Sequence, residues 1–326
     1  MVQLEIATTE QKLLGFLQRA FPLEPRPYYR LGQMLGVTET QVIDHIQKLR
    51  DRGMVRSIEP VVDARRLGYQ STLVALKVPA ERTRKAEQAI QAHPGISHGY
   101  ERDHDFNVWV TLSVPPTSSI DAEVERLSAN TGAITRLALP AVKLFKIGAY
   151  FDVDNTEQMP TAHNGKLPVK LELSNEDRRV INALQQDLPL TATPFDTIAL
   201  EAGMSVDDLL AHSRSLLERG VIRRFSASIN HRRAGFQANA MTCWAIPDER
   251  VDTIGKELAE LREVSHCYER QTCAGWRHNL FAMIHSHSRD SCLELIQNVS
   301  QRLNLRDYVV LFSTREFKKT RIKYTA

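Results

Sequence analysis

One heptapeptide pattern occurs twice in this chain and constrains the fold more than any other feature. The first copy, ISHGYER, occupies residues 96–102, and the second copy, VSHCYER, occupies residues 264–270. Other residues match at nearly the same spacing: Pro22 with Pro189, Gly36 with Gly203, Gly53 with Gly220, Gly68 with Gly235, and Asn107 with Asn279. Self-similarity at a nearly constant spacing indicates internal repetition. The chain is therefore a tandem duplication of one structural unit.

Each half opens with a block of helical pattern. In the first half, a helix over about 9–20 is followed by a short helix that ends at Gly36, and Thr38 can cap a further helix that ends at Gly53. The second half repeats this order, with helices over about 195–202 and 206–219. Two helices joined by a short turn predict a winged helix-turn-helix domain in each half.

The remainder of each half alternates strand and helix patterns. In the first half, strands are predicted at 72–78, 96–102, 106–112 and about 136–147, with helices at 82–92 and 118–129. In the second half, strands are predicted at 238–246, 264–271, 279–285 and 307–315, with helices at 249–261 and 289–302. The order βαββαβ is the ferredoxin-like arrangement, in which both helices cover one face of an antiparallel sheet. The fold class is therefore α+β.

These patterns divide the chain into five segments. They are a helix-turn-helix domain at 1–60, a βαββαβ domain at 61–151, a linker at 152–173, a second helix-turn-helix domain at 174–228 and a second βαββαβ domain at 229–326. The linker is polar and contains Pro160, Gly165 and Pro168. We expect it to be a flexible tether that lets the two halves pair.

The repeated heptapeptide carries the first candidate site residues. Alternate side chains of a strand share one face, so each copy places histidine, tyrosine and arginine in one row. The rows are His98, Tyr100 and Arg102 in the first half, and His266, Tyr268 and Arg270 in the second. Such a row sets a titratable ring, an amphipathic ring and a fixed cation side by side.

The neighbouring strand of each hairpin also has two distinct faces. Phe106, Val108, Val110 and Leu112 alternate with polar or aromatic residues, and we expect them to lie under the helices. The opposite face carries Asn107, Trp109, Asn279, Phe281 and His285. If the two halves pack face to face, these residues and the two rows line a common cavity.

Composition excludes several classes of protein. The 326 residues are 42% hydrophobic and 25% charged, with a formal net charge of +3, which is typical of a soluble globular protein. No apolar run could cross a membrane, and the N-terminus lacks a signal-peptide pattern. The four cysteines form no CxxC pair, so neither a zinc site nor a disulfide framework is indicated. A cytoplasmic location is expected.

The charges of the helix-turn-helix blocks disfavour DNA as a partner. A recognition helix offers its N-terminal residues to bases and phosphates. Here the first such helix starts with Glu39 and the second with Val206-Asp207-Asp208. Carboxylates at these positions repel phosphate. A DNA-binding regulator with a small-molecule effector at the sheets remains one candidate function.

The duplicated layout resembles the Lrp/AsnC regulator architecture, and the motifs narrow the resemblance. HPGISHGYERDHDFNVWVTL at 93–112 and VSHCYERQTCAGWRHNLFAMIH at 264–285 resemble the siroheme decarboxylases, with one subunit type in each half. The resemblance implies a carboxy-lyase that removes two acetate carboxyl groups of siroheme, giving 12,18-didecarboxysiroheme in heme d1 or alternative heme b biosynthesis. It implies no cofactor beyond the iron carried by siroheme. A second copy of the chain or further decarboxylase subunits are candidate partners.

The chemistry of such a substrate assigns roles to the candidate residues. Arginine suits carboxylates because its fork donates two parallel hydrogen bonds, and a histidine can protonate the carbon that loses carbon dioxide. The expected catalytic residues are His98, Tyr100, His266 and Tyr268. The expected substrate-binding residues are Arg65, Arg66, Arg102, Asn107, Trp109, Arg232, Arg233, Arg270, Asn279, Phe281 and His285. His104 and His278 are candidate axial ligands to the siroheme iron, whereas Ser97 and Ser265 are expected to be strand filler.

Overall fold

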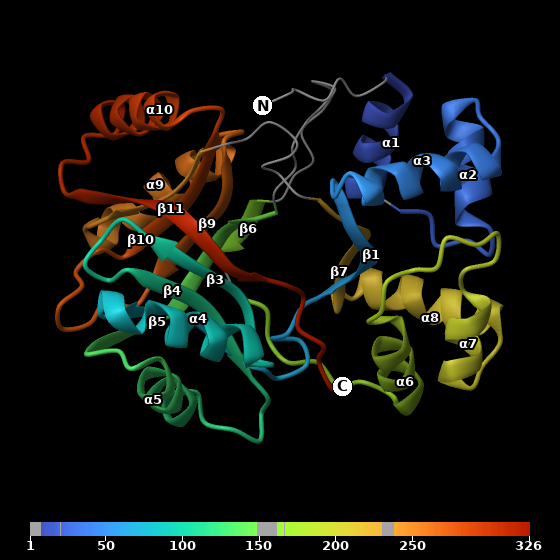
Figure 1. Ribbon diagram of the computed structural model, residues 1–326, viewed down its shortest axis with the longest axis horizontal. Coiled ribbons are helices and arrows are strands. Elements are labelled where there is room, and N and C mark those ends of the chain that lie inside the picture. Colours follow the sequence, from blue (N-terminus) through green and yellow to red (C-terminus); the bar gives the residue numbers. More distant parts are fainter. Residues whose placement is uncertain (1–7, 20, 149–161, 166, 230–237) are drawn as a thin grey trace.

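A computed structural model describes residues 8–19, 21–148, 162–165, 167–229 and 238–326 of the chain (Figure 1). The elements form two groups. A helical group, at the right in Figure 1, contains the start of each half, and a strand-rich group at the left contains the remainder. A two-stranded sheet lies between the groups. No described helix has both the length and the apolar character needed to cross a bilayer.

The helical group is two helix-turn-helix domains that share one core. Its helices are α1 (Thr8–Arg19), α2 (Pro27–Leu35), α3 (Glu39–Asp51), α6 (Asn175–Leu184), α7 (Asp196–Ala202) and α8 (Val206–Glu218). Gly36 and Gly203 end α2 and α7 with φ angles of 71° and 65°, which a residue with a side chain rarely adopts. Thr38 caps α3 as predicted, in a capping box with Gln41. The buried apolar faces of both domains form a single cluster.

The two helical domains are also joined by strands β1 (Val55–Val62) and β7 (Ile222–Ile229). These strands follow α3 and α8 and pair antiparallel across the two halves, with Ile58 opposite Ala227. The side chain of Asp187 strengthens this junction, because its Oδ1 accepts hydrogen bonds from the Ile58 amide at 2.8 Å and the Arg50 guanidinium at 2.7 Å. The helical domains therefore form one unit and not two separate arms.

The strand-rich group contains the two predicted βαββαβ units. The first has β2 (Gln70–Lys77), the short helix η1 (Ala80–Arg82), α4 (Thr83–Ala92), β3 (Ile96–Arg102), β4 (Val108–Val114), α5 (Ile120–Thr131) and β5 (Thr135–Ile147). The second has β8 (Ala238–Trp244), α9 (Asp248–Glu260), β9 (Val264–Arg270), β10 (Leu280–Ser286), α10 (Arg289–Arg302) and β11 (Tyr308–Lys319). The observed elements follow the order predicted from the sequence.

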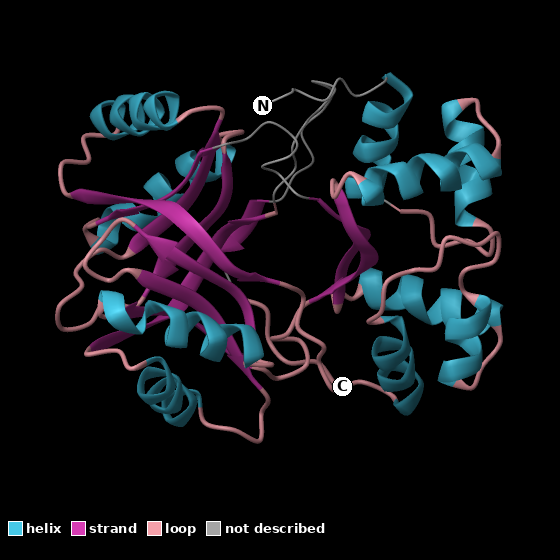
Figure 2. Cartoon of the chain, in the orientation of Figure 1, coloured by secondary structure: helices cyan, strands magenta, loops and turns pink. Residues whose placement is uncertain are grey.

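The two units are joined edge to edge as well as face to face. β5 pairs with β9 of the other half, and β11 pairs with β3, while β5 also keeps its place beside β2. The strands therefore close into a ring in the order β2-β4-β3-β11-β8-β10-β9-β5, an antiparallel barrel with its helices outside (Figure 2). We call the barrel end that faces β1 and β7 the mouth.

The sides of the barrel wall have the predicted apolar faces, with one exception. Val108, Val110 and Leu112 lie under α4 and α5. The inner face holds a common core from both halves: Leu73, Ala75, Trp109, Leu137, Leu139, Met241, Cys243, Trp276, Phe281 and Leu311. The prediction for Phe106 was wrong, because this residue precedes β4 in the hairpin loop and packs against the inner core beside Trp276. Trp276 closes the end of the barrel remote from the mouth.

The linker is more ordered in its described part than a flexible tether. Residues Ala162–Gly165 form strand β6, which pairs with β5. Further along, Leu171 and Leu173 pack against the helical core, and the Leu171 amide donates to the Arg66 carbonyl at 3.0 Å. Leu171 and Leu173 explain this order, because they are apolar residues within a polar segment and their burial against the helical core is favourable.

The exchange of β5 between halves predicts a specific destabilisation. Phe145 on β5 is 1% exposed and packs in the core of the second unit, against Gly255 of α9, where a Cβ atom would lie 2.5 Å from the ring. We expect Phe145→Ala to lower the free energy of unfolding by about 3–5 kcal/mol. Val142→Ala, on the same strand but 45% exposed, should cost about 0.5 kcal/mol or less. Urea unfolding checks both, and equal midpoints for the two variants would contradict the exchange.

Candidate active site

The two His-Tyr-Arg rows point into the barrel. Tyr100 on β3 lies opposite Trp109, and Tyr268 on β9 lies opposite Phe281. Directly opposed residues of an antiparallel pair share one face, and both aromatic partners belong to the inner core. Each row therefore runs down the inner wall, with its histidine near the mouth and its arginine at the deep end.

The two arginines of the rows are desolvated cations without an anionic partner in the described part of the chain. Arg102 donates through Nη1 to the Leu311 carbonyl at 2.8 Å, and Arg270 donates through Nη1 to the Leu139 carbonyl at 2.8 Å. Burial lowers the pKa of both guanidiniums to about 10. The Nε atoms of both side chains are buried and make no hydrogen bond within the described structure. A buried guanidinium in this state favours an anionic ligand.

Each arginine also lies over the tyrosine of its own row. The Arg102 guanidinium is 5.6 Å from the centre of the Tyr100 ring, and that of Arg270 is 4.9 Å from the Tyr268 ring. Cation–π contacts of this kind hold the planar fork in place. Burial raises the pKa of Tyr268, so its hydroxyl remains a hydrogen-bond donor at neutral pH.

Further cations gather at the mouth, and only Arg65 among them was predicted from the sequence. Lys319 lies opposite His98 across β11 and β3, and Arg56 of β1 donates to the Lys319 carbonyl at 3.1 Å. Arg65 and Arg223 both act on the Tyr268 hydroxyl by lowering its pKa against the effect of burial. Arg56, Arg223 and Arg65 come from β1, β7 and the loop before β2, whereas Lys319 ends β11. The helical unit therefore supplies cations to the mouth, with Arg56 paired to Glu316 and Arg223 to Asp63.

Both row histidines are neutral at neutral pH. Burial, followed by the charges of Lys319 and Arg56, lowers the pKa of His98 to about 4. Burial also lowers the pKa of His266 well below its usual value, and the charge of His98 contributes. The His98 side chain is nevertheless exposed and that of His266 half-buried. Because the charge of His98 acts on His266, the two rows lie close to each other at the mouth.

Two serines bind the row histidines, contrary to their expected role as strand filler. The Ser97 hydroxyl lies 2.9 Å from His98 Nδ1, and the Ser265 hydroxyl lies 2.8 Å from His266 Nδ1. Ser265 also lies 2.8 Å from Nε2 of His285. The sequence did contain a signal for this role of the serines, because a serine precedes the histidine in both copies of the heptapeptide.

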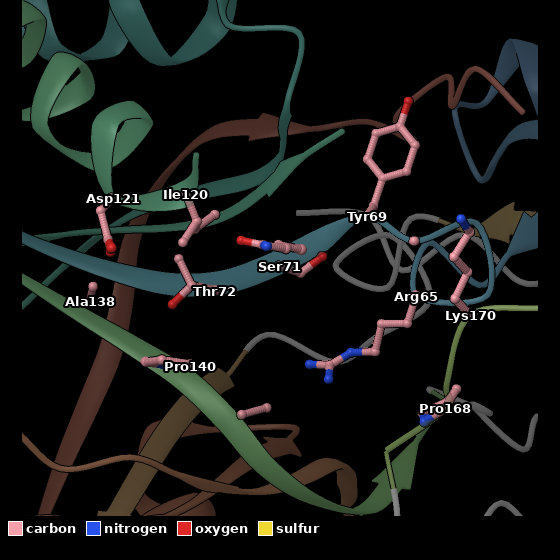
Figure 3. A pocket seen from close by; sticks show the side chains of 13 residues that line it. Arg65, Tyr69, Ser71, Thr72, Ile120, Asp121, Ala138, Pro140, Pro168 and Lys170 are labelled. Carbon is pink, nitrogen blue, oxygen red and sulfur yellow. The ribbon is translucent and has the colours of Figure 1, made fainter. Parts of the chain in front are cut away.

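A separate cavity of about 440 Å³ lies beside the mouth, between β2, β5, the start of α5 and the linker (Figure 3). Of the predicted site residues, only Arg65 lines it. Thr72 and Ala138 of its lining lie on the outer side of the barrel wall, away from the rows. Arg65 lines this cavity and also acts on Tyr268.

Four of the predicted binding residues have structural roles. The side-chain amide of Asn107 exchanges two hydrogen bonds of 2.9 Å with the backbone of Val78, and that of Asn279 does the same with Ile246 at 2.8 and 2.9 Å. Trp109 and Phe281 are 1% and 3% exposed and belong to the inner core. The amides brace the strand ends, and the aromatic rings form the floor below the rows.

The remaining predicted residues lie away from the mouth or outside the described residues. Arg66 donates to the Val169 carbonyl in the linker. His104 and His278 lie in the hairpin loops at the closed end, where both pack against Trp276 with ring centres 5.7 and 5.2 Å away. The inner core separates them from the mouth, so we do not retain them as iron ligands. Arg232 and Arg233 lie outside the described residues.

Comparison with families of known proteins agrees with this architecture. Residues 66–146 and 233–318 match the AsnC-like ligand binding domain, and residues 10–56 and 177–223 match the siroheme decarboxylase NirDL-like HTH domain. A crystal structure of the siroheme decarboxylase NirDL is similar with a TM-score of 0.74 and 36% identity, covering 98% of this chain and 95% of that one. A second structure of NirDL, in complex with an iron-uroporphyrin III analogue, has the same TM-score.

Individual relatives match along almost the whole chain. The siroheme decarboxylase of Hydrogenobacter thermophilus is 40% identical over 96% of this chain and 94% of its own length. The siroheme decarboxylase NirDL subunit of Paracoccus denitrificans is 32% identical over 94% of each chain. The siroheme decarboxylase beta subunit of Methanosarcina barkeri is 40% identical over 46% of this chain and 99% of its own length. By this similarity and the fold described above, the chain belongs to the siroheme decarboxylase family.

Proposed function

We propose that this protein removes two acetate carboxyl groups from siroheme, giving 12,18-didecarboxysiroheme. The observation that carries the proposal is the pair of desolvated guanidiniums, of the buried Arg102 and the half-buried Arg270, which have no carboxylate partner in the described structure and lie below two neutral histidines. Such a site suits a ligand with several carboxylates around an apolar plate. The product is an intermediate for heme d1 or heme b.

The side chains divide the chemistry between binding and proton transfer. The arginines and the mouth cations hold the carboxylates of the substrate, and the tyrosine rings offer flat apolar contact beside them. When the bond between the methylene carbon and the carboxyl carbon breaks, carbon dioxide leaves and the electron pair remains on the methylene carbon. The conjugated macrocycle of the substrate delocalises this charge, so we propose no cofactor beyond the substrate's own iron. An imidazole then gives a proton to the carbon.

Both halves of the chain contribute to the proposed site. The two rows lie on opposite parts of the barrel. Separate beta and alpha subunits of siroheme decarboxylases from other organisms each match 46% of this chain, over 99% and 87% of their own length. This supports a fused arrangement in which one polypeptide supplies both subunit types. Association with a second copy or with further subunits stays a prediction, as does the cytoplasmic location, with which four unpaired cysteines agree.

The regulator alternative is disfavoured by the ion pairs of the helix-turn-helix domains. The arginines late in the two candidate recognition helices are engaged within the protein: Arg50 with Asp187 at 2.7 Å, Arg52 with Glu10, Arg219 with Asp177 at 2.7 Å, and Arg214 with the Leu23 carbonyl at 2.8 Å. DNA affinity needs cations that can meet phosphates. We therefore expect no DNA binding, and a salt-dependent shift of promoter DNA would favour the regulator.

The central prediction concerns the row histidines. We expect the wild-type protein to release two molecules of carbon dioxide from siroheme under anaerobic conditions, as measured by the mass of the product. The double variant His98→Ala/His266→Ala should lose turnover by about 100-fold or more, because the proton donors are gone, while the absorbance change on siroheme binding is kept. The exposed His287→Ala is the matched control. Normal turnover by the double variant would exclude both histidines, and siroheme that binds without losing mass would indicate a carrier.

A second prediction tests the buried guanidiniums. Arg270→Met should weaken siroheme binding by about 10- to 100-fold, since a charge-assisted hydrogen bond contributes about 1.5–3 kcal/mol. Arg306→Met removes an exposed arginine at the closed end of the barrel and should leave the dissociation constant unchanged. An absorbance titration measures both, with thermal melting as the check that Arg270→Met is folded. Equal affinities for the two variants would exclude Arg270 from the binding site.

A third prediction follows from the depressed histidine pKa values. In the free protein, the pKa of His98 is about 4, so this imidazole is neutral at pH 6. Bound carboxylates favour the imidazolium form and raise this pKa, so binding should take up protons and grow tighter as pH falls from 8 to 6. Calorimetry at pH 6 in two buffers of different ionisation enthalpy measures the uptake. A binding enthalpy that is the same in both buffers would contradict carboxylate contact with the histidines.

A further inference from the structure

The histidine row of the second half has a partner that the first half lacks. Ser265 lies between two imidazoles, 2.8 Å from Nδ1 of His266 and 2.8 Å from Nε2 of His285. With Asn107 matched to Asn279, the position of His285 is occupied in the first half by Ser113, which bonds to Ser71 at 2.7 Å instead. Ser97 therefore binds His98 without a second imidazole behind it.

A local irregularity of each strand explains why serine and histidine contact each other. In β9 the pairing register shifts between Val264 and His266, and in β3 it shifts between Ile96 and His98. The residue at such a β-bulge is re-aimed out of the regular alternation of the strand. Ser265 is thereby 4% exposed and directed toward the same side as His266.

The hydrogen of one hydroxyl couples the two imidazoles. A serine has a single proton to donate. The Met283 carbonyl lies 3.5 Å from the Ser265 hydroxyl and is a weaker acceptor than a ring nitrogen at 2.8 Å, so we assign the proton to one ring nitrogen, and Ser265 accepts from the other. When Ser265 donates to Nδ1 of His266, the neutral His266 carries its proton on Nε2, and Nε2–H of His285 donates to Ser265. In this arrangement His266 is a proton donor without being an imidazolium ion.

We propose that His285 and Ser265 are positioning residues that form a proton relay to His266, so that the second-half histidine is the proton donor of the site. The inference rests on the proposed function. As carbon dioxide leaves, the methylene carbon takes the Nε2 proton of His266, and Nδ1 of His266 takes the Ser265 proton. Ser265 takes the Nε2 proton of His285, and His285 Nδ1 takes one proton from water. The reaction consumes one solvent proton for each carbon dioxide released.

The charged groups around the relay favour this neutral mechanism over a resting imidazolium. His98, Arg223 and Arg224 act on His266, and Lys319 and Arg102 act on His285. All of these groups are cations or bases, and each lowers the pKa of the imidazole that it faces. His98 lies opposite Lys319 and bonds to Ser97. It is suited instead to contact a substrate carboxylate.

Three single variants test the relay with siroheme as substrate. Ser265→Ala breaks the chain, whereas His285→Gln keeps an amide that can bond to Ser265 but cannot pass a proton. Both should lower kcat about tenfold or more, with KM within about threefold. Ser97→Ala, which removes the matching hydroxyl of the first half, should lower kcat by less than about threefold. Retention of kcat within twofold by either Ser265→Ala or His285→Gln would overturn the relay.

A measurement independent of turnover distinguishes the relay from a structural role. In the free protein with ¹⁵N-labelled histidine, we expect NMR to show His266 with Nε2 protonated and Nδ1 unprotonated. Ser265→Ala should replace this single tautomer by a mixture, with thermal melting as the folding control. An unchanged tautomer in Ser265→Ala would overturn the proposal. Failure of the proposed function would appear in the wild-type protein as absent carbon dioxide release, whereas failure of the relay alone leaves wild-type turnover intact.

Discussion

Two hydrogen-bonded seams, β5 with β9 and β3 with β11, determine the rest of this structure. A ferredoxin-like sheet on its own has one uncovered face and two unpaired edges, and both are costly to leave in water. Pairing across the duplication removes the edges and turns both open faces inward. The same closure brings two copies of a polar row to one mouth. The same pairing of strands therefore both stabilises the fold and forms the site.

Duplication supplied two equal rows, and later differences made them unequal. The registers place Lys319 opposite His98 but Ile147 opposite His266. His285 stands behind the second row, where the first has Ser113. The insertion in the second hairpin adds Trp276, which fills the closed end for both halves. A substrate with two acetate groups has no need of two identical sites, and one mouth with two different walls can hold one group while acting on another.

Much of the fold could be predicted from the sequence because local signals agreed with the tertiary structure. Gly36 and Gly203 marked helix ends, and alternation in the hairpins separated the helix-facing side from the inner side. The closure of the barrel could not be predicted, since nothing in the local pattern of β5 says that its second edge pairs with β9. The row residues were found from their repetition. Lys319, Arg223 and Ser265 were missed because their positions depend on cross-strand register and on a bulge, which sequence spacing does not encode.

The helix-turn-helix domains have a structural explanation that does not involve DNA. Their arginines bond within the helical unit, where Arg50 with Asp187 and Arg214 with the Leu23 carbonyl join the two domains, and their strands β1 and β7 carry Arg56 and Arg223 to the mouth of the barrel. Arg56 pairs with Glu316 and Arg223 with Asp63, whereas Arg102 and Arg270 have no carboxylate partner in the described structure and place positive charge beside neutral imidazoles in the resting protein. Such an arrangement is unfavourable alone, because like charges are brought together at reduced dielectric. A flat ligand with several carboxylates neutralises this positive charge. Binding energy from carboxylates remote from the reaction can then hold the reacting carboxylate in a position where it loses solvation.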